Sequence, residues 1–143
     1  MEKVGESIKE ALQVAKEKWE EIAPGRPFEP QRVAVSYRRG MKIKVDGKPF
    51  VEMSHFLGFY IAKVGRYVGS LSPGQSMVVK KEEQHFARIL SEKGEVVGER
   101  EEKVLGVFHV AQDSTLTFLD MGGGVEIEAD VVIRSLEHLL GEG

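Results

Sequence analysis

The sequence predicts an α+β fold, a single domain over residues 1–143 with an antiparallel meander sheet of about five to seven strands and N-terminal, central and C-terminal helices. Apolar residues recur at helical steps of three and four in three segments, and elsewhere they alternate with the strand period of two. The chain has no internal repeat and no long linker, and 143 residues are enough to bury one hydrophobic core.

The first expected elements are an N-terminal helix over residues 2–22 and a basic hairpin over residues 32–52. The helix stops at Pro24-Gly25, and its apolar stripe is formed by Val4, Ile8, Leu12, Ala15, Trp19 and Ile22. In the hairpin, apolar residues alternate with basic ones, and Asp46-Gly47 is typical of a tight turn between paired strands.

Residues 54–71 carry the clearest pattern, and we expect them to form a central helix that begins at the cap Ser54. Their apolar stripe is Phe56, Leu57, Tyr60, Ile61, Val64, Val68 and Leu71. A line of small residues runs beside that stripe, formed by Gly58, Ala62, Gly65 and Gly69. The remaining face would present one aromatic ring among basic groups, formed by His55, Phe59, Lys63 and Arg66.

The rest of the chain is expected to form an antiparallel meander over residues 76–129 and a C-terminal helix over residues 130–140. Turn residues separate the strands at Glu92-Lys93-Gly94, at Gln112-Asp113-Ser114 and in the glycine-rich loop 121–124. Asp130 is the expected cap of the last helix.

Charge is distributed unevenly along the chain, although the net charge is only −3. Residues 26–82 carry a net charge of +7, whereas residues 83–143 carry −8. The strand pattern places the basic groups Arg32, Arg38, Lys42 and Lys44 on the face away from the core. A ladder of like charges on one sheet face is destabilising unless an anionic ligand matches it, so the pattern favours a basic binding surface.

Several function classes lack their sequence signals. The chain has no cysteine, and its four histidines, His55, His85, His109 and His138, do not have ligand spacing, so we expect no metal and no cofactor. His109 lies on a strand that is apolar on both faces and is expected to be a hydrogen-bonded core or edge histidine. No nucleophile elbow, zincin pair or phosphate loop is present, so no catalytic residue and no enzyme is expected.

The composition predicts a cytoplasmic protein. No apolar run reaches the length of a membrane span, and the N-terminus has no apolar leader, so no membrane association is expected. Asparagine and cysteine are both missing while glutamate, lysine and arginine are abundant, which is typical of thermophilic proteins.

The sequence favours a non-enzymatic regulatory protein that docks a basic, aromatic surface on an acidic patch of a larger protein, in transcription or other nucleic-acid machinery. An exposed aromatic among basic groups has the composition of an interface hot spot, unless another layer of the fold covers Phe59. The expected partner-binding residues are His55, Phe59, Lys63, Arg66, Arg38, Arg39, Lys42 and Lys44. Direct nucleic-acid binding by the same surface is the second hypothesis.

A third hypothesis comes from the order of the elements. A long central helix followed by a meander of antiparallel strands resembles the hotdog fold of acyl-thioester hydrolases. The resemblance concerns topology and no sequence motif. It implies that His55, at the start of the helix, and the glycines on the helix would lie near the thioester.

Overall fold

The computed structural model describes the backbone of residues 2–90 and 96–134, and the side chains of residues 5–81 and 103–134. These residues form one helix and ten strands, and the strands build two five-stranded antiparallel sheets. The fold is therefore mostly antiparallel sheet with one helix, and it fits the α+β class only loosely. No helix of the described ranges is long and apolar enough to cross a membrane.

The two sheets differ in how far their strands are separated along the chain. The first has the strand order β10–β1–β8–β7–β6, with bounds β1 Arg32–Tyr37, β6 Ser76–Leu90, β7 Val96–Val110, β8 Thr115–Asp120 and β10 Val131–Ile133. The second has the order β5–β4–β3–β2–β9, with bounds β2 Met41–Val45, β3 Lys48–Phe56, β4 Phe59–Val64, β5 Tyr67–Leu71 and β9 Glu126–Glu128. Four consecutive strands thus make most of the second sheet.

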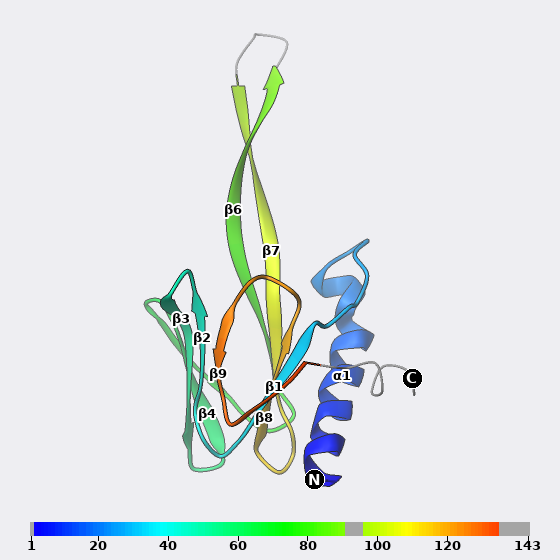
Figure 1. Ribbon diagram of the computed structural model, residues 1–143, viewed down its shortest axis with the longest axis vertical. Helices are drawn as coiled ribbons and strands as arrows, with labels where there is room; N and C mark the ends of the chain where they lie inside the picture. The colour runs from blue at the N-terminus through cyan, green and yellow to red at the C-terminus, as the bar shows by residue number, and fades with distance from the viewer. Residues whose placement is uncertain (1, 91–95, 135–143) are drawn as a thin grey trace.

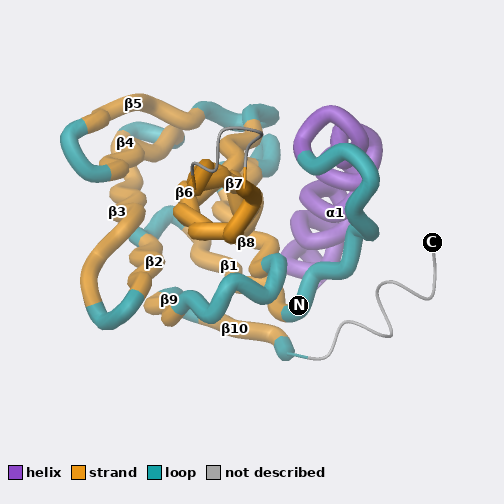
Figure 2. The backbone as a smooth tube through the Cα atoms, turned by 90° about the horizontal axis from the view of Figure 1, so that it is seen from above, coloured by secondary structure: helices purple, strands orange, loops and turns teal. Residues whose placement is uncertain are grey.

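The molecule has three layers, with the first sheet in the middle (Figures 1 and 2). The helix α1 (Glu2–Ile22) covers one face of this sheet, and the second sheet covers the other. A core between the two sheets contains Phe108 and Phe118, whose ring centroids lie 4.6 Å apart. A separate core lies between α1 and the first sheet, where Trp19 packs with Val33 and Leu119. The helix forms where the sequence predicts it because its apolar stripe is buried against this sheet.

A two-stranded ribbon projects from this body (Figure 1). β8 pairs with β7 only from Gly106 to Val110, whereas the pairing of β6 with β7 continues to Leu90 opposite Val96. Like charges stand opposite one another along the ribbon, namely Lys81 with Lys103, Glu82 with Glu102 and Glu83 with Glu101.

The prediction of a central helix over residues 54–71 is wrong, because these residues form the end of β3, all of β4 and all of β5. Gly58 and Gly65, which helical spacing placed on a packing line, lie in the two hairpin turns with φ of 87° and 61°. A right-handed helix requires negative φ at every residue, and glycines in positive-φ turns end each strand instead. The helix on which the hotdog resemblance rests is therefore not formed.

The predictions at residues 32–52 and 130–140 also need correction. β1 does not pair with β2: the chain passes from the first sheet to the second between Tyr37 and Met41, and the hairpin is formed by β2 and β3. Val131–Ile133 form the strand β10, which pairs with β1, instead of beginning a helix. The remainder of the predicted C-terminal helix, beyond residue 134, lies outside the described residues.

Candidate functional site

The turn between β3 and β4 exposes an apolar residue in a strained conformation. Phe56 pairs with Phe59, so Leu57 and Gly58 form a two-residue hairpin loop, and both have positive φ, 49° and 87°. This is the geometry of a type I′ turn, which favours asparagine, aspartate or glycine at the first position. A leucine there costs about 1 kcal/mol of conformational energy, and the Leu57 residue is 81% exposed.

The same protein contains a turn of the same kind with favourable residues. Asp46 and Gly47, between β2 and β3, have φ of 52° and 77°. Aspartate tolerates this conformation and keeps a polar side chain in water. The contrast indicates that Leu57 serves something other than the stability of the hairpin, because strained residues that are not needed for folding gather at functional sites.

Two aromatic residues at the same end of the molecule are also exposed. Phe56 is 52% exposed, and its ring meets the half-buried Phe59 ring edge to face, with centroids 5.7 Å apart. Tyr37, at the end of β1, is also 52% exposed, and the guanidinium of Arg38 lies 5.2 Å from the centre of its ring. Rigid aromatic side chains and arginine are the residue types that dominate protein–protein hot spots.

The buried phenol of Tyr60 ties three turns together at this end of the molecule. Its oxygen accepts a hydrogen bond from the Arg38 N–H at 3.1 Å and donates one to the carbonyl of Ser114 at 2.5 Å. The Ser114 hydroxyl in turn donates to the Gly58 carbonyl at 2.6 Å. Burial raises the pKa of Tyr60 to about 12, so the phenol keeps its proton at neutral pH.

We call this arrangement the turn cluster: residues 37–39, 56–59 and 113–114. It lies at the end of the body opposite the projecting ribbon, near the N-terminus of α1 (Figure 1). Its hydrogen bonds fix the Leu57 turn to the two neighbouring turns.

Four of the eight predicted partner-binding residues lie in or beside the turn cluster, but they do not share one face. They are Arg38, Arg39, Phe59 and His55. Arg38, Arg39 and Phe59 belong to the turn cluster. His55 points to the opposite face of β3 from Phe56, because neighbouring strand residues alternate. Its ring meets Tyr60 edge to face, and its Nε2 accepts the Gly58 N–H at 3.2 Å. His55 thus supports the turn from within the sandwich.

The predicted ladder of like charges on the outer face of the second sheet is wrong. Lys44 contacts Glu128 at 2.6 Å and Lys42 contacts Glu52 at 3.7 Å, and Lys63 stands opposite Glu52 in the strand register. The bond to Glu128 raises the pKa of Lys44, and the same bond lowers the pKa of Glu128. Cations and anions alternate because β3 and β9 contribute glutamates, and β9 comes from a distant part of the sequence.

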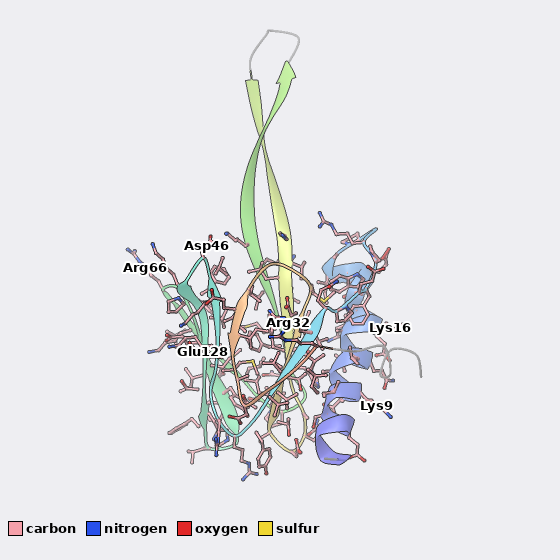
Figure 3. All side chains as sticks on the ribbon, viewed as in Figure 1. Lys9, Lys16, Arg32, Asp46, Arg66 and Glu128 are labelled. Carbon is pink, nitrogen blue, oxygen red and sulfur yellow. The ribbon has the colours of Figure 1, made fainter. Side chains whose placement is uncertain are left out.

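Two further basic groups lie away from the turn cluster. Arg66 is in the turn between β4 and β5, and Figure 3 shows it near Asp46 at the ribbon end of the second sheet. Arg32 is not part of an open basic face: its Nε donates to the buried Asp120 carboxylate at 2.7 Å, and its Nη2 donates to the Val125 carbonyl at 2.7 Å. This pair links β1 to the end of β8.

Sequence reasoning missed Tyr37, Phe56 and Leu57 as surface residues. The helical pattern placed Phe56 and Leu57 on an apolar stripe, and the alternation over residues 32–52 placed Tyr37 among the apolar residues of the hairpin. A glycine directly after Leu57, between two segments that also fit strand alternation, was the available signal for a hairpin turn.

No protein-family model, no curated protein and no solved structure matches this chain. Among the side chains of residues 5–81 and 103–134, no group of three or more histidine, aspartate or glutamate side chains is arranged to hold a metal ion.

Proposed function

We propose that the protein acts by binding, and that it docks the turn cluster on a larger protein. The observation that carries this proposal is Leu57, which is strained and almost fully exposed on a turn that the rest of the fold holds rigid. In water such a residue carries two free-energy costs: the strain of its positive-φ backbone and the exposure of its apolar side chain. Both costs are offset if the side chain is buried in a partner.

The chemistry of the cluster defines the partner's surface. Leu57 and Phe56 require an apolar pocket. Arg38 and Arg39 follow Tyr37 in the same cluster: the Arg38 guanidinium lies 5.2 Å from the centre of the Tyr37 ring, and the Arg39 side chain is 77% exposed, with Asp130 at 3.7 Å. Arginines at the rim of an apolar contact favour acidic groups on the other side, which steer the encounter and select the partner. The proposed partner is therefore a protein with an apolar pocket and an acidic rim.

Protein is a better match than nucleic acid for the outer face of the second sheet. Binding to a phosphate backbone needs cations that are free to replace counterions. Lys42 and Lys44 already contact glutamates, and releasing them would leave those glutamates beside the incoming phosphates. The apolar character of the turn cluster, with its aromatic and leucine side chains, points the same way.

A site-specific photo-crosslinker tests the proposal. The reactive amino acid is placed at Leu57 in one variant and at Asp46, in the matched turn of the same sheet, in another. A protein that is crosslinked from position 57 and not from position 46 is then purified, and its affinity is measured for the wild-type chain. Leu57→Asn is expected to weaken that affinity about 30-fold or more, because loss of a hot-spot side chain removes at least about 2 kcal/mol.

Charge reversal tests the acidic rim. Arg38→Glu with Arg39→Glu is expected to weaken binding to the same protein and to slow its association, and added salt should reduce the difference. Lys42→Glu, on the outer face of the second sheet, is the control and should leave affinity unchanged. The proposal fails if Leu57→Asn binds as tightly as the wild type, or if the two positions give the same crosslinks.

A further inference from the structure

A second site consists of three polar side chains from separate parts of the chain, Glu10, Ser76 and His109. His109 on β7 is 2% exposed, and the Ser76 hydroxyl on β6 lies 2.7 Å from its Nδ1. The Glu10 carboxylate on α1 lies 2.6 Å from its Nε2. Ser76 and His109 are direct cross-strand partners, so both project from the face of the first sheet that α1 covers.

In a neutral imidazole, one ring nitrogen donates a hydrogen bond and the other accepts one. When His109 is neutral, the ionised Glu10 carboxylate can only accept, so the proton is on Nε2 and the Nε2–H donates a hydrogen bond to Glu10. The lone pair of Nδ1 then accepts the Ser76 O–H. An oriented imidazole whose free lone pair receives a serine proton is the arrangement that activates a nucleophilic serine.

The burial of His109 indicates that the hydrogen-bonded set of Glu10, His109 and Ser76 has a role besides packing. The core between this face of the first sheet and α1 is formed by apolar side chains, among them Val33, Val107 and Leu119. Thr117 stands on the other side of His109 in the register, and its buried hydroxyl is without a hydrogen-bond partner among the described residues. Replacing such buried polar groups by apolar side chains of similar shape is often neutral or stabilising.

Ser76 also has space beside it. It lines an open cavity of about 440 Å³ at the free edge of β6, together with Tyr67, Leu71 and Met77. The nearby loop offers little to a developing oxyanion, because the N–H of Gly74 already donates to Val110 and that of Gln75 to Ser72. This restricts the chemistry to acyl donors with good leaving groups, which need less stabilisation of the tetrahedral intermediate.

We propose that Ser76 is a nucleophile, with His109 as its general base and Glu10 as the residue that orients His109, and that it accepts acyl groups from thioesters or aryl esters. The Ser76 Oγ bonds to the carbonyl carbon while its proton moves to His109 Nδ1. The carbon–sulfur or carbon–oxygen bond to the leaving group then breaks, and the leaving group takes that proton. The products are acyl-Ser76 and a thiol or phenol, and water releases the acyl group by the same steps.

The test uses the full chain with a fluorophosphonate probe, p-nitrophenyl acetate and phenyl thioacetate, with adducts located by mass spectrometry. The wild type should be modified at Ser76, and Ser76→Ala should lose the modification. Ser70→Ala is the matched control, because Ser70 lines the same cavity and should leave the rate unchanged. Leu57→Asn should also react at the wild-type rate, which separates this inference from the binding function.

Glu10→Gln tests the orienting role. The amide can donate to Nε2, which shifts the imidazole proton to Nδ1 and removes the base, so the labelling rate should fall about 100-fold. Nitrogen-15 chemical shifts should show the His109 proton on Nε2 in the wild type and on Nδ1 in the variant, a change that a packing role alone does not require. Unmodified Ser76 with all three reagents, or an unchanged rate in Glu10→Gln, would overturn the proposal.

Discussion

The Tyr60 hydroxyl donates a hydrogen bond to the Ser114 carbonyl at 2.5 Å, between residues 54 positions apart in the sequence. The same oxygen accepts the Arg38 N–H, so one side chain satisfies backbone groups of two turns. The exposed Leu57 turn is fixed to these two turns through Ser114 and Gly58. The geometry of the proposed docking surface therefore depends on a residue that is itself fully buried.

Removal of that hydroxyl should destabilise the fold. Tyr60→Phe keeps the ring and leaves the Ser114 carbonyl and the Arg38 N–H without their partner, so the free energy of unfolding should fall by about 1–3 kcal/mol. Chemical denaturation measures the change. Tyr67→Phe, at an exposed tyrosine, is the control and should alter stability by less than about 0.5 kcal/mol. Equal effects of the two substitutions would show that the Tyr60 bonds contribute nothing.

Stability should also depend on pH through Tyr60. In the folded protein, burial disfavours the phenolate and raises the pKa of Tyr60 from its ordinary value of 10.0 to about 12. The contribution is complete below pH 10 and is lost as the pH rises from about 10 to 12, since the unfolded chain gives up its proton first. Over that window the wild type should lose about 2–3 kcal/mol more than Tyr60→Phe. Parallel curves for the two proteins would contradict this assignment.

Substitutions at the first positions of the two type I′ turns, Leu57 and Asp46, should change stability in opposite directions. Leu57→Asn should raise the free energy of unfolding by about 1 kcal/mol and the melting temperature by about 3 °C. Asp46→Leu should lower stability by a similar amount, because it introduces the same strain. Thermal melts of both variants provide the measurement. Destabilisation by Leu57→Asn would mean that the leucine packs in the isolated protein.

Breaking the ion pair of Arg32 with the buried Asp120 should lower stability much more than breaking the exposed pair of Lys44 with Glu128. Asp120→Ala removes a nearly fully buried carboxylate that accepts from Arg32 and from the Gly122 N–H at 3.0 Å. The partly buried guanidinium then loses its counterion, so stability should fall by about 3 kcal/mol. Glu128→Ala breaks the exposed pair with Lys44 and should cost less than about 1 kcal/mol. The comparison requires only denaturation curves at one pH.

Part of the proposed site was accessible to sequence reasoning. Phe59 was selected as an aromatic among basic groups, and Arg38 and Arg39 as part of the basic hairpin; all three lie in the turn cluster. Leu57 was missed because steps of three and four through residues 54–71 fit a helix as well as alternation fits two strands. Gly58 and Gly65 decide between these readings only through their positive φ, and the spacing of apolar residues does not reveal that angle.

Local features could be read from the chain alone: the amphipathic helix α1, the Asp46-Gly47 turn and the alternation in β1 and β2, because each depends on residues within one or two turns of backbone. Which strands pair, and therefore which charges meet, follows from the tertiary structure. Glutamates from β9 balance the lysines of β2, and Glu10 reaches His109 across 99 positions. Contacts of this kind are set by how two sheets and a helix bury their apolar faces together, and no local pattern in the chain encodes them.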